Sequence, residues 1–317
     1  MSFQWLRRAL VLAASSVLLA ACGGGDVVSQ LNPSRIVAFG DGLSDVGQTG
    51  KRYTINDGST NIWTAEVARR YGLTLTAVVS GGTSYATGNA RVNTKPDAAG
   101  NSATPTVKEQ IDTFLAGGTF GGNDLVIVQG GVSDIVAEVA RQKAGLQTAD
   151  QTTANVRQAG KDLGAQVRRV VQAGAKSVVV VGTYNLGKSP WASVTAQITP
   201  LTDLSAKFNE EMLVSIVDLG ASVLYVDAAF YLNLVTASPV SYKFIDGAAG
   251  TVVCTSVDPG PGIGIGNGQV NSALCGPSTL IAGIDPLVYL FADPIYLTPQ
   301  AHRMLGEHAY DRIRTRF

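Results

Sequence analysis

Residues 36–47, IVAFGDGLSDVG, decide the fold of this 317-residue chain. Four apolar residues, typical of a short buried strand, lead directly into a turn rich in Gly and Asp. Strands that alternate with amphipathic helices predict a parallel sheet covered on both faces. We therefore expect a three-layer α/β/α domain with a five-stranded parallel sheet. The other apolar runs are at 75–79, 125–128, 178–181 and 223–226, and helical patterns lie at 63–71, 156–171, 204–216 and 299–313.

The first 32 residues are typical of an export signal followed by a tether. Two arginines precede an apolar run at 9–20, which is too short to span a bilayer as a helix. The run ends in Leu19-Ala20-Ala21-Cys22, which resembles the lipobox of bacterial lipoproteins and implies a lipid on Cys22. Because Gly23 follows, and not the Asp that commonly retains such proteins at the inner membrane, we expect the outer membrane of the cell envelope. The expected divisions are a signal peptide at 1–21, a flexible lipid-anchored tether at 22–32 and a single domain at 33–317.

The composition excludes several classes of function. The 24 Lys and Arg residues balance the 24 Asp and Glu residues, and removal of Arg7 and Arg8 with the signal peptide leaves 22 against 24, a net charge of −2. A nearly neutral chain offers no cationic surface to nucleic acid. Two His and three Cys are too few for an ordinary zinc site unless nearly all converge, so we expect no metal and no cofactor. The expected partner is the membrane, reached through the lipid.

The two remaining cysteines, Cys254 and Cys275, flank a turn-rich stretch at 257–262. An exported protein lies in an oxidising compartment, which favours a disulfide over two free thiols. Such a bridge would close a loop of about 20 residues and stabilise the fold by about 3 kcal/mol. We expect it to hold a long loop that has little structure of its own.

Four blocks of sequence resemble those of the GDSL, or SGNH, hydrolases. Residues 39–47, FGDGLSDVG, follow the family pattern F-G-D-S-L-S-D, and residues 85–92, YATGNARV, follow Y-A-x-G-G-A-R-V. Residues 131–134, GVSD, resemble G-x-N-D, and residues 291–298, FADPIYLT, resemble F-A-D-G-V-H-P-T. The resemblance implies a flavodoxin-like SGNH fold and ester hydrolysis, with the site at the carboxyl ends of the strands.

The catalytic residues that the resemblance implies are mostly replaced. Gly42 stands at the nucleophilic Ser, Ser133 at the oxyanion-binding Asn and Tyr296 at the catalytic His, whereas Gly88 and Asp293 are retained. Glycine has no side chain with which to attack an ester. Tyrosine, with a reference pKa near 10 against about 6.5 for histidine, is a poor general base at neutral pH. These positions predict a vestigial site.

Other residues could in principle replace the missing ones. An active ester hydrolase could use a rearranged site, with Ser44 or Ser133 as nucleophile and His302 as base. Ser44 is also typical of a helix cap, and His302 lies near an apolar helix face, where a packed histidine is commoner. An acidic cluster could bind a cation, although carboxylates near helix N-termini already interact favourably with the dipole. That cluster would comprise Asp41, Asp45 and Asp134.

The sequence thus predicts an exported lipoprotein with an ester hydrolase fold and a degenerate catalytic site. Its expected role is non-catalytic, as a binding or structural protein of the envelope. An acyl chain, a glycan or a protein partner would bind in a cleft at the ends of the strands.

Overall fold

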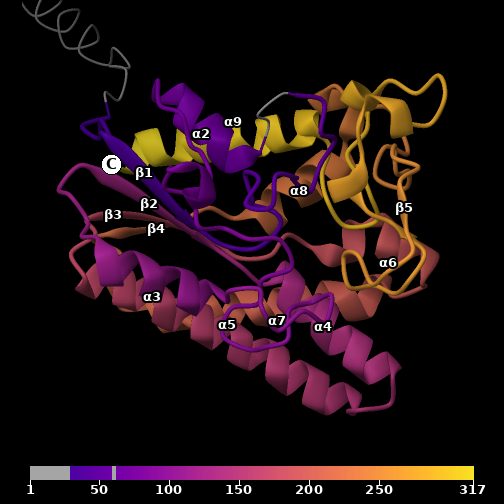
Figure 1. Ribbon diagram of the computed structural model, residues 1–317, viewed down its shortest axis with the longest axis horizontal. Coiled ribbons are helices and arrows are strands. Elements are labelled where there is room, and N and C mark those ends of the chain that lie inside the picture. Colours follow the sequence, from indigo (N-terminus) through magenta and orange to yellow (C-terminus); the bar gives the residue numbers. More distant parts are fainter. Residues whose placement is uncertain (1–28, 59–61) are drawn as a thin grey trace, which may run out of the picture.

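The computed structural model describes residues 29–58 and 62–317. The predicted signal peptide, Cys22 and most of the predicted tether lie outside these ranges. Figure 1 shows a central sheet with helices on both faces, which confirms the three-layer α/β/α fold. In the described part of the chain no helix has both the length and the apolar composition needed to cross a membrane.

The sheet is parallel, and its four strands follow one another in the order β1-β2-β3-β4. Val37 pairs with Val126, Val126 with Val178, and Val178 with Val223. Every residue of β2 and β3 is buried, as expected for strands covered on both faces. The strands are β1 (Arg35–Phe39), β2 (Asp124–Gln129), β3 (Ser177–Val181) and β4 (Val223–Tyr225).

The prediction of a fifth strand at 75–79 is wrong. Within the described residues this segment forms only isolated bridges, and a short 3-10 helix, η1 (Val78–Ser80), begins inside it. Val78 N–H donates to the Ser84 carbonyl at 2.8 Å and Ser84 N–H to the Thr76 carbonyl at 3.0 Å, so the chain folds back on itself. Only the neighbourhood of Ser84 reaches the sheet, where Tyr85 N–H donates to the Ala38 carbonyl at 2.7 Å. The backbone groups that a strand would offer to β1 are used inside this turn.

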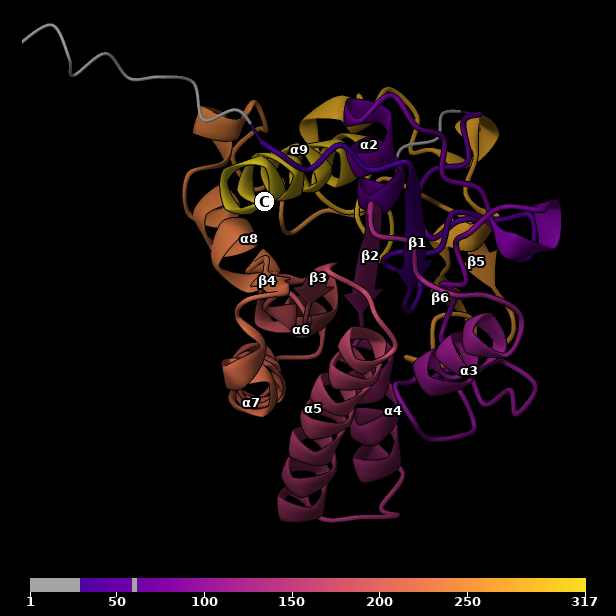
Figure 2. The ribbon, with the colours of Figure 1, turned by 90° about the vertical axis from the view of Figure 1, so that its left-hand side faces the viewer.

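Two groups of helices enclose the sheet. Figure 2 shows α2, α8 and α9 on one face and α3, α4, α5 and α7 on the other. The four helical patterns seen in the sequence are confirmed in α2, α5, α7 and α9. The helices are α2 (Trp63–Arg70), α3 (Val107–Gly117), α4 (Val132–Lys143), α5 (Ala149–Gln172), α6 (Pro190–Val194), α7 (Ile198–Ile216), α8 (Ala228–Ala237) and α9 (Pro299–Arg316). The other 3-10 turns are η2 (Leu186–Lys188), η3 (Val217–Leu219), η4 (Pro239–Tyr242), η5 (Ser272–Leu274), η6 (Pro277–Thr279) and η7 (Pro286–Val288).

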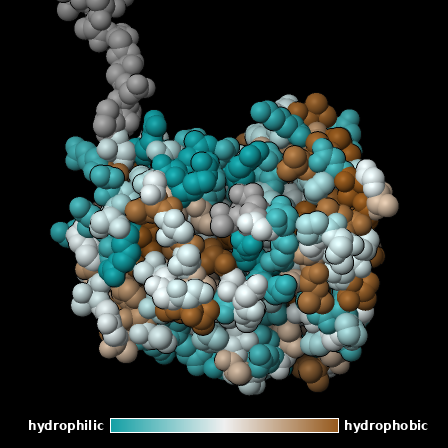
Figure 3. Space-filling model, turned by 45° about the horizontal axis from the view of Figure 1, so that its top comes forward, coloured by the Kyte–Doolittle hydropathy of each residue, from teal (hydrophilic) through white to brown (hydrophobic). Residues whose placement is uncertain are grey.

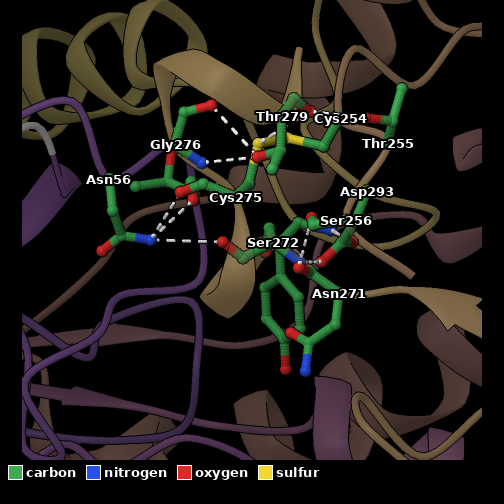
Figure 4. Close-up of a disulfide and its surroundings, with 12 residues drawn as sticks. Asn56, Cys254, Thr255, Ser256, Asn271, Ser272, Cys275, Gly276, Thr279 and Asp293 are labelled. Carbon is green, nitrogen blue, oxygen red and sulfur yellow. Dashed lines mark hydrogen bonds between the residues drawn. A yellow bond between two sulfur atoms is a disulfide. The ribbon is translucent and has the colours of Figure 1, made fainter. Parts of the chain in front are cut away.

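Residues 243–298, here called the cystine segment, connect η4 to α9. They contain a two-residue antiparallel pair, β5 (Val257–Asp258) with β6 (Gln269–Val270), and the disulfide Cys254–Cys275, whose Cα atoms are 5.9 Å apart. Asn56 holds the segment to the body, because its side-chain amide donates to the carbonyls of Ser272 and Cys275 at 3.2 Å each (Figure 4). Figure 3 shows hydrophobic residues gathered on the right of the molecule, the side on which Figure 1 places this segment.

The first described residues, Gln30 to Ser34, contact the domain at the amino ends of the strands. Gln30 N–H donates to the carbonyl of Phe317 at 3.2 Å, and Leu31 packs against the core. Ser34 N–H then donates to Asn123, just before β2. The predicted site lies at the opposite, carboxyl ends of the strands.

Candidate active site

The turn after β1 brings Gly42 against the side chain of Tyr296, which comes from the end of the cystine segment. A Cβ atom at Gly42 would lie 2.7 Å from Tyr296 Oη and 2.9 Å from Cζ, closer than carbon atoms approach in proteins. Tyr296 is almost completely buried. The phenol therefore fills the volume in which a nucleophilic side chain at position 42 would lie.

Tyr53 covers this phenol from a loop. The rings of Tyr53 and Tyr296 have centroids 4.8 Å apart at an interplanar angle of 51°. A Cβ atom at Gly88 would lie 2.0 Å from Tyr53 Cε2, so the same ring also packs directly on Gly88. Tyr53 lies in an irregular loop outside the four blocks, so the sequence alone does not indicate its place in the site.

Asp293 of the family pattern is retained, but its carboxylate accepts hydrogen bonds from backbone N–H groups. Its Oδ1 accepts the N–H groups of Ile295 and Tyr296 at 2.8 and 2.7 Å, and its Oδ2 accepts that of Ser272 at 2.8 Å. Burial raises the pKa of Asp293 to about 6, against the effect of these hydrogen bonds. The carboxyl group thus fixes the turn that directs Tyr296 into the site.

Burial raises the pKa of Tyr296 well above its ordinary value, and the carboxylates of Asp41 and Asp293 raise it further. A group with so high a pKa stays protonated at neutral pH and does not accept a proton from a nucleophile. Tyr296, which the sequence resemblance aligns with the catalytic base, therefore lacks the properties of a base.

Ser133 lies in the first turn of α4, at the carboxyl end of β2. Its N–H donates to Asp41 Oδ2 at 3.4 Å, and its buried hydroxyl lies beside the phenol of Tyr296. Burial raises the pKa of Asp41 to about 6. The structure thus brings Gly42, Ser133 and Tyr296 to one edge of the sheet, as the four blocks predict, but Ser133 is not hydrogen-bonded to a base.

The Gly88 amide, which the resemblance assigns to oxyanion binding, already has an acceptor. Gly88 N–H donates to Asp45 Oδ2 at 2.8 Å. Asp45 Oδ1 accepts the N–H groups of Gly47 and Gln48, also at 2.8 Å each. A carboxylate here competes with any substrate oxyanion for the amide and repels its charge.

Ser44, the other candidate nucleophile, is fully buried, and its hydroxyl both donates and accepts a hydrogen bond. Its hydroxyl donates to Gln129 Oε1 at 3.0 Å and accepts the indole N–H of Trp63 at 3.0 Å. Gln129 Oε1 also accepts the Asp41 N–H. The hydroxyl of Ser44 therefore joins the turn after β1 to β2 and α2, a structural function that accounts for its position.

His302 is not paired with either serine. It is completely buried in α9, and neither ring nitrogen makes a hydrogen bond within the described residues. Burial lowers the pKa of His302 to about 3, so the ring is neutral. His308 is half-buried on the same helix and stacks on Tyr231, with ring centroids 4.1 Å apart. Within residues 29–58 and 62–317, no group of three His, Cys, Asp or Glu side chains is arranged to hold a metal ion.

Two cavities lie beside α4, displaced from Gly42. One, of about 450 Å³, is polar and is lined by Arg91, Asp134, Glu138 and Asn155 among others. In it Arg91 forms ion pairs with Asp134, at 3.6 Å, and with Glu138. The second, of about 480 Å³, is mainly apolar. The two share Ala98, Gly100 and Ala140, and neither is lined by Gly42, Ser133 or Tyr296.

Comparisons with known proteins agree with this fold. The model of the GDSL-like lipase/acylhydrolase family matches residues 36–309. A Pseudomonas putida relative, described as an uncharacterized protein in the trpE-trpG intergenic region, is 27% identical over 165 residues, which cover 52% of this chain but only 26% of that protein.

Two solved structures are similar at low identity. Est24, a carbohydrate acetylesterase from Sinorhizobium meliloti, is 15% identical with a TM-score of 0.46, over 89% of this chain and 99% of that one. The aryl esterase of M. smegmatis is 15% identical with a TM-score of 0.44, over the same shares of the two chains.

Proposed function

This chain belongs to the GDSL-like lipase and acylhydrolase family, and from that premise we propose that it is a member without hydrolytic activity. It is an exported lipoprotein, anchored by lipid on Cys22 to the outer membrane, with a binding or structural role in the envelope. The main support for a loss of activity is the contact between Gly42 and Tyr296. The phenol occupies the position of the nucleophile, so neither attack nor substrate approach is possible there.

Three further observations support the proposal. The Gly88 amide is bonded to Asp45, the Ser44 hydroxyl is bonded to Gln129, and the His302 ring is hydrogen-bonded to neither Ser44 nor Ser133 in the described structure. A rearranged site would need one of these groups to leave its present environment. A ligand role belongs instead to the cavities beside α4, where the polar one suits a glycan and the apolar one an acyl chain.

The direct test is ester turnover. Purified protein, incubated with short-chain nitrophenyl esters and a fluorophosphonate probe, should show no hydrolysis above background and no labelled serine. Turnover that disappears in Ser44→Ala or Ser133→Ala would contradict the proposal and establish the rearranged site.

A matched variant restores the family residues. The triple variant Gly42→Ser, Ser133→Asn and Tyr296→His replaces the phenol and supplies a nucleophile, an amide donor and a base. We expect labelling at position 42 and measurable hydrolysis, because the variant removes the phenol that fills the volume beside position 42 and supplies the replaced groups. A folded triple variant that is neither labelled nor active would show that these positions do not form one vestigial site.

A further inference from the structure

Helix α4 contributes to both cavities, and its sequence differs on the two faces that line them. Asp134, Glu138 and Arg141 follow one another at spacings of four and three residues, so they share one face of the helix, which lines the polar cavity. Val136 and Val139 lie on a neighbouring face, which lines the apolar cavity. One helix thus presents charged groups to one cavity and valines to the other.

The border between the cavities consists of small residues. Ala140 of α4 and two residues of the loop before α3, Ala98 and Gly100, line both cavities. None of the three has a side chain larger than a methyl group, so their side chains leave room for a ligand to cross from one cavity to the other. The two cavities, of about 450 and 480 Å³, are therefore neighbouring parts of one hollow.

The outer wall of the apolar cavity comes from the cystine segment. Pro261 and Ile265, in the loop between β5 and β6, line this cavity together with Trp191 of α6. Asn89 ties the loop to the body, because its side-chain amide donates to the carbonyl of Gly262 at 2.9 Å. The loop that the disulfide holds in place thus encloses an apolar volume.

The charges of the polar cavity favour a ligand head without negative charge. In the described structure four carboxyl groups and three basic groups line it. Arg91 is already paired with Asp134 and Glu138. Lys95 is paired with Glu109 at 3.0 Å. A phosphate or carboxylate head would therefore add its charge to an existing excess of acidic groups.

Amide side chains complete the lining of the polar cavity. Asn93, Asn155 and Gln158 belong to it, and all three are exposed. An amide both donates and accepts hydrogen bonds, and so does a hydroxyl group. The polar cavity therefore matches a head with several hydroxyl groups, whereas the apolar cavity matches a hydrocarbon chain.

We propose that the two cavities bind one amphipathic ligand, a glycolipid with an uncharged sugar head. The head lies between α4 and α5, and the acyl chain passes over Ala140 into the volume under the loop between β5 and β6. This inference rests on the proposed binding role and names the class of ligand. A chain that is joined to a bound head enters its own cavity as an intramolecular step, which raises the affinity above that of either part alone.

Two photoreactive derivatives of decyl maltoside test this arrangement in the purified full chain, below the concentration at which micelles form. The tail probe carries a diazirine at the end of the alkyl chain and should label the apolar cavity, at Val139 or Ile265. The head probe carries it on the sugar and should label the polar cavity, at Asn155 or Gln158. If both probes labelled the same residues, or residues outside the two cavities, the proposal would be overturned.

A variant at the border tests whether one ligand occupies both cavities. Ala140→Phe places a ring between them at an exposed helix position, so the fold should tolerate it. Labelling by the tail probe should fall by at least about tenfold, because the chain is separated from its head. Ala206→Phe is the matched control, since Ala206 is exposed on α7 and lines neither cavity. Unchanged labelling in Ala140→Phe, or an equal loss in Ala206→Phe, would contradict the proposal.

Competition in the wild type identifies the head. Unlabelled decyl maltoside should displace the tail probe at a concentration at least about tenfold lower than decyl phosphate does, because the acidic lining disfavours the phosphate. Equal displacement by the two compounds would overturn the uncharged sugar head.

An ester-linked ligand separates this inference from the proposed function. Decyl maltoside contains no ester, so its binding is measured independently of hydrolysis. Sucrose monodecanoate has a similar head and chain joined by an ester. If it displaces the tail probe and is cleaved, the proposed loss of activity fails and the class of ligand stands. If neither maltoside probe labels the cavities and the ester stays intact, only the class of ligand fails.

Discussion

Tyr296 and Gly42 depend on each other, because the phenol oxygen lies 2.7 Å from the place where a side chain at position 42 would begin. The surrounding structure leaves the ring little freedom to move. Tyr53 packs against it, and Asp293 accepts the backbone N–H groups of Ile295 and Tyr296. A larger residue at position 42 must therefore displace well-packed atoms, and a smaller residue at position 296 must leave a void.

Gly42→Ser alone should destabilise the protein by about 1–3 kcal/mol, the usual cost of overpacking a buried site. Tyr296→His alone should also destabilise it, because it removes part of a buried ring. In the double variant the two changes relieve each other, so the free energy of unfolding should exceed the additive value by at least about 1 kcal/mol. Urea unfolding of the four proteins measures this coupling. Strict additivity would mean that the phenol moves aside at little cost.

The pH dependence of stability offers a second test at the level of one residue. Burial raises the pKa of Asp134 to about 7, so the folded protein holds this proton more tightly than the unfolded chain does. The resulting stability is present below the unfolded pKa and is lost as pH rises through 7, with a slope that approaches about 1.4 kcal/mol per pH unit. Asp134→Asn removes this dependence.

The wild type should therefore lose stability relative to Asp134→Asn between pH 5 and pH 8, as measured by urea midpoints. His302 is present in both proteins and its own titration cancels in the difference. Asp203 is exposed, so Asp203→Asn serves as the control. Its plot of stability against pH should run parallel to that of the wild type. If the difference in stability between the wild type and Asp134→Asn stayed constant over this pH range, Asp134 would be ionised in the folded protein throughout.

Much of the site at this scale could be predicted, and the limits have a physical cause. The four blocks identified Gly42, Ser133 and Tyr296, which the structure brings to one edge of the sheet. Sequence could not show that Asp45 accepts the Gly88 amide or that the phenol fills the space at Gly42, since both depend on which side-chain conformations fit together. Of the two contacts, the triple variant would remove only that of the phenol with Gly42.

At the scale of elements, apolar runs predicted four strands correctly and the segment at 75–79 incorrectly. Its composition suits a strand, but composition does not reveal where the backbone hydrogen bonds go. Here they close a turn at Gly81 and Gly82, so that only a bridge at Ser84 remains beside β1. The helices were easier to predict, because α5 and α7 carry long apolar stripes that a strand cannot satisfy.

The disulfide is the main covalent constraint on the cystine segment, and the two cysteines are 21 residues apart. Replacement by Cys254→Ala and Cys275→Ala together should lower the free energy of unfolding by about 3 kcal/mol. Because Asp293 and Tyr296 belong to the same segment, the loss should be accompanied by faster amide exchange at Ile295 and Tyr296. Reductant should weaken the wild type in the same way and leave the double variant unchanged. Equal stability of both proteins would mean that packing alone holds the segment.

At the scale of the whole molecule, the two ends of the sheet carry different features. At the amino ends of the strands, the Gln30 N–H donates to the carbonyl of Phe317 and the Ser34 N–H to that of Asn123. The carboxyl ends carry Gly42, Ser133 and Tyr296, with the two cavities close by along α4.

The close contact of Gly42 with Tyr296 also constrains the evolutionary history open to this protein. A lineage that regained serine first would carry an overpacked centre, and one that regained histidine first would carry a void without a nucleophile. Each single change is expected to lower the free energy of unfolding and to leave the protein without hydrolysis. An active descendant would therefore have to change positions 42 and 296 together, and position 133 besides.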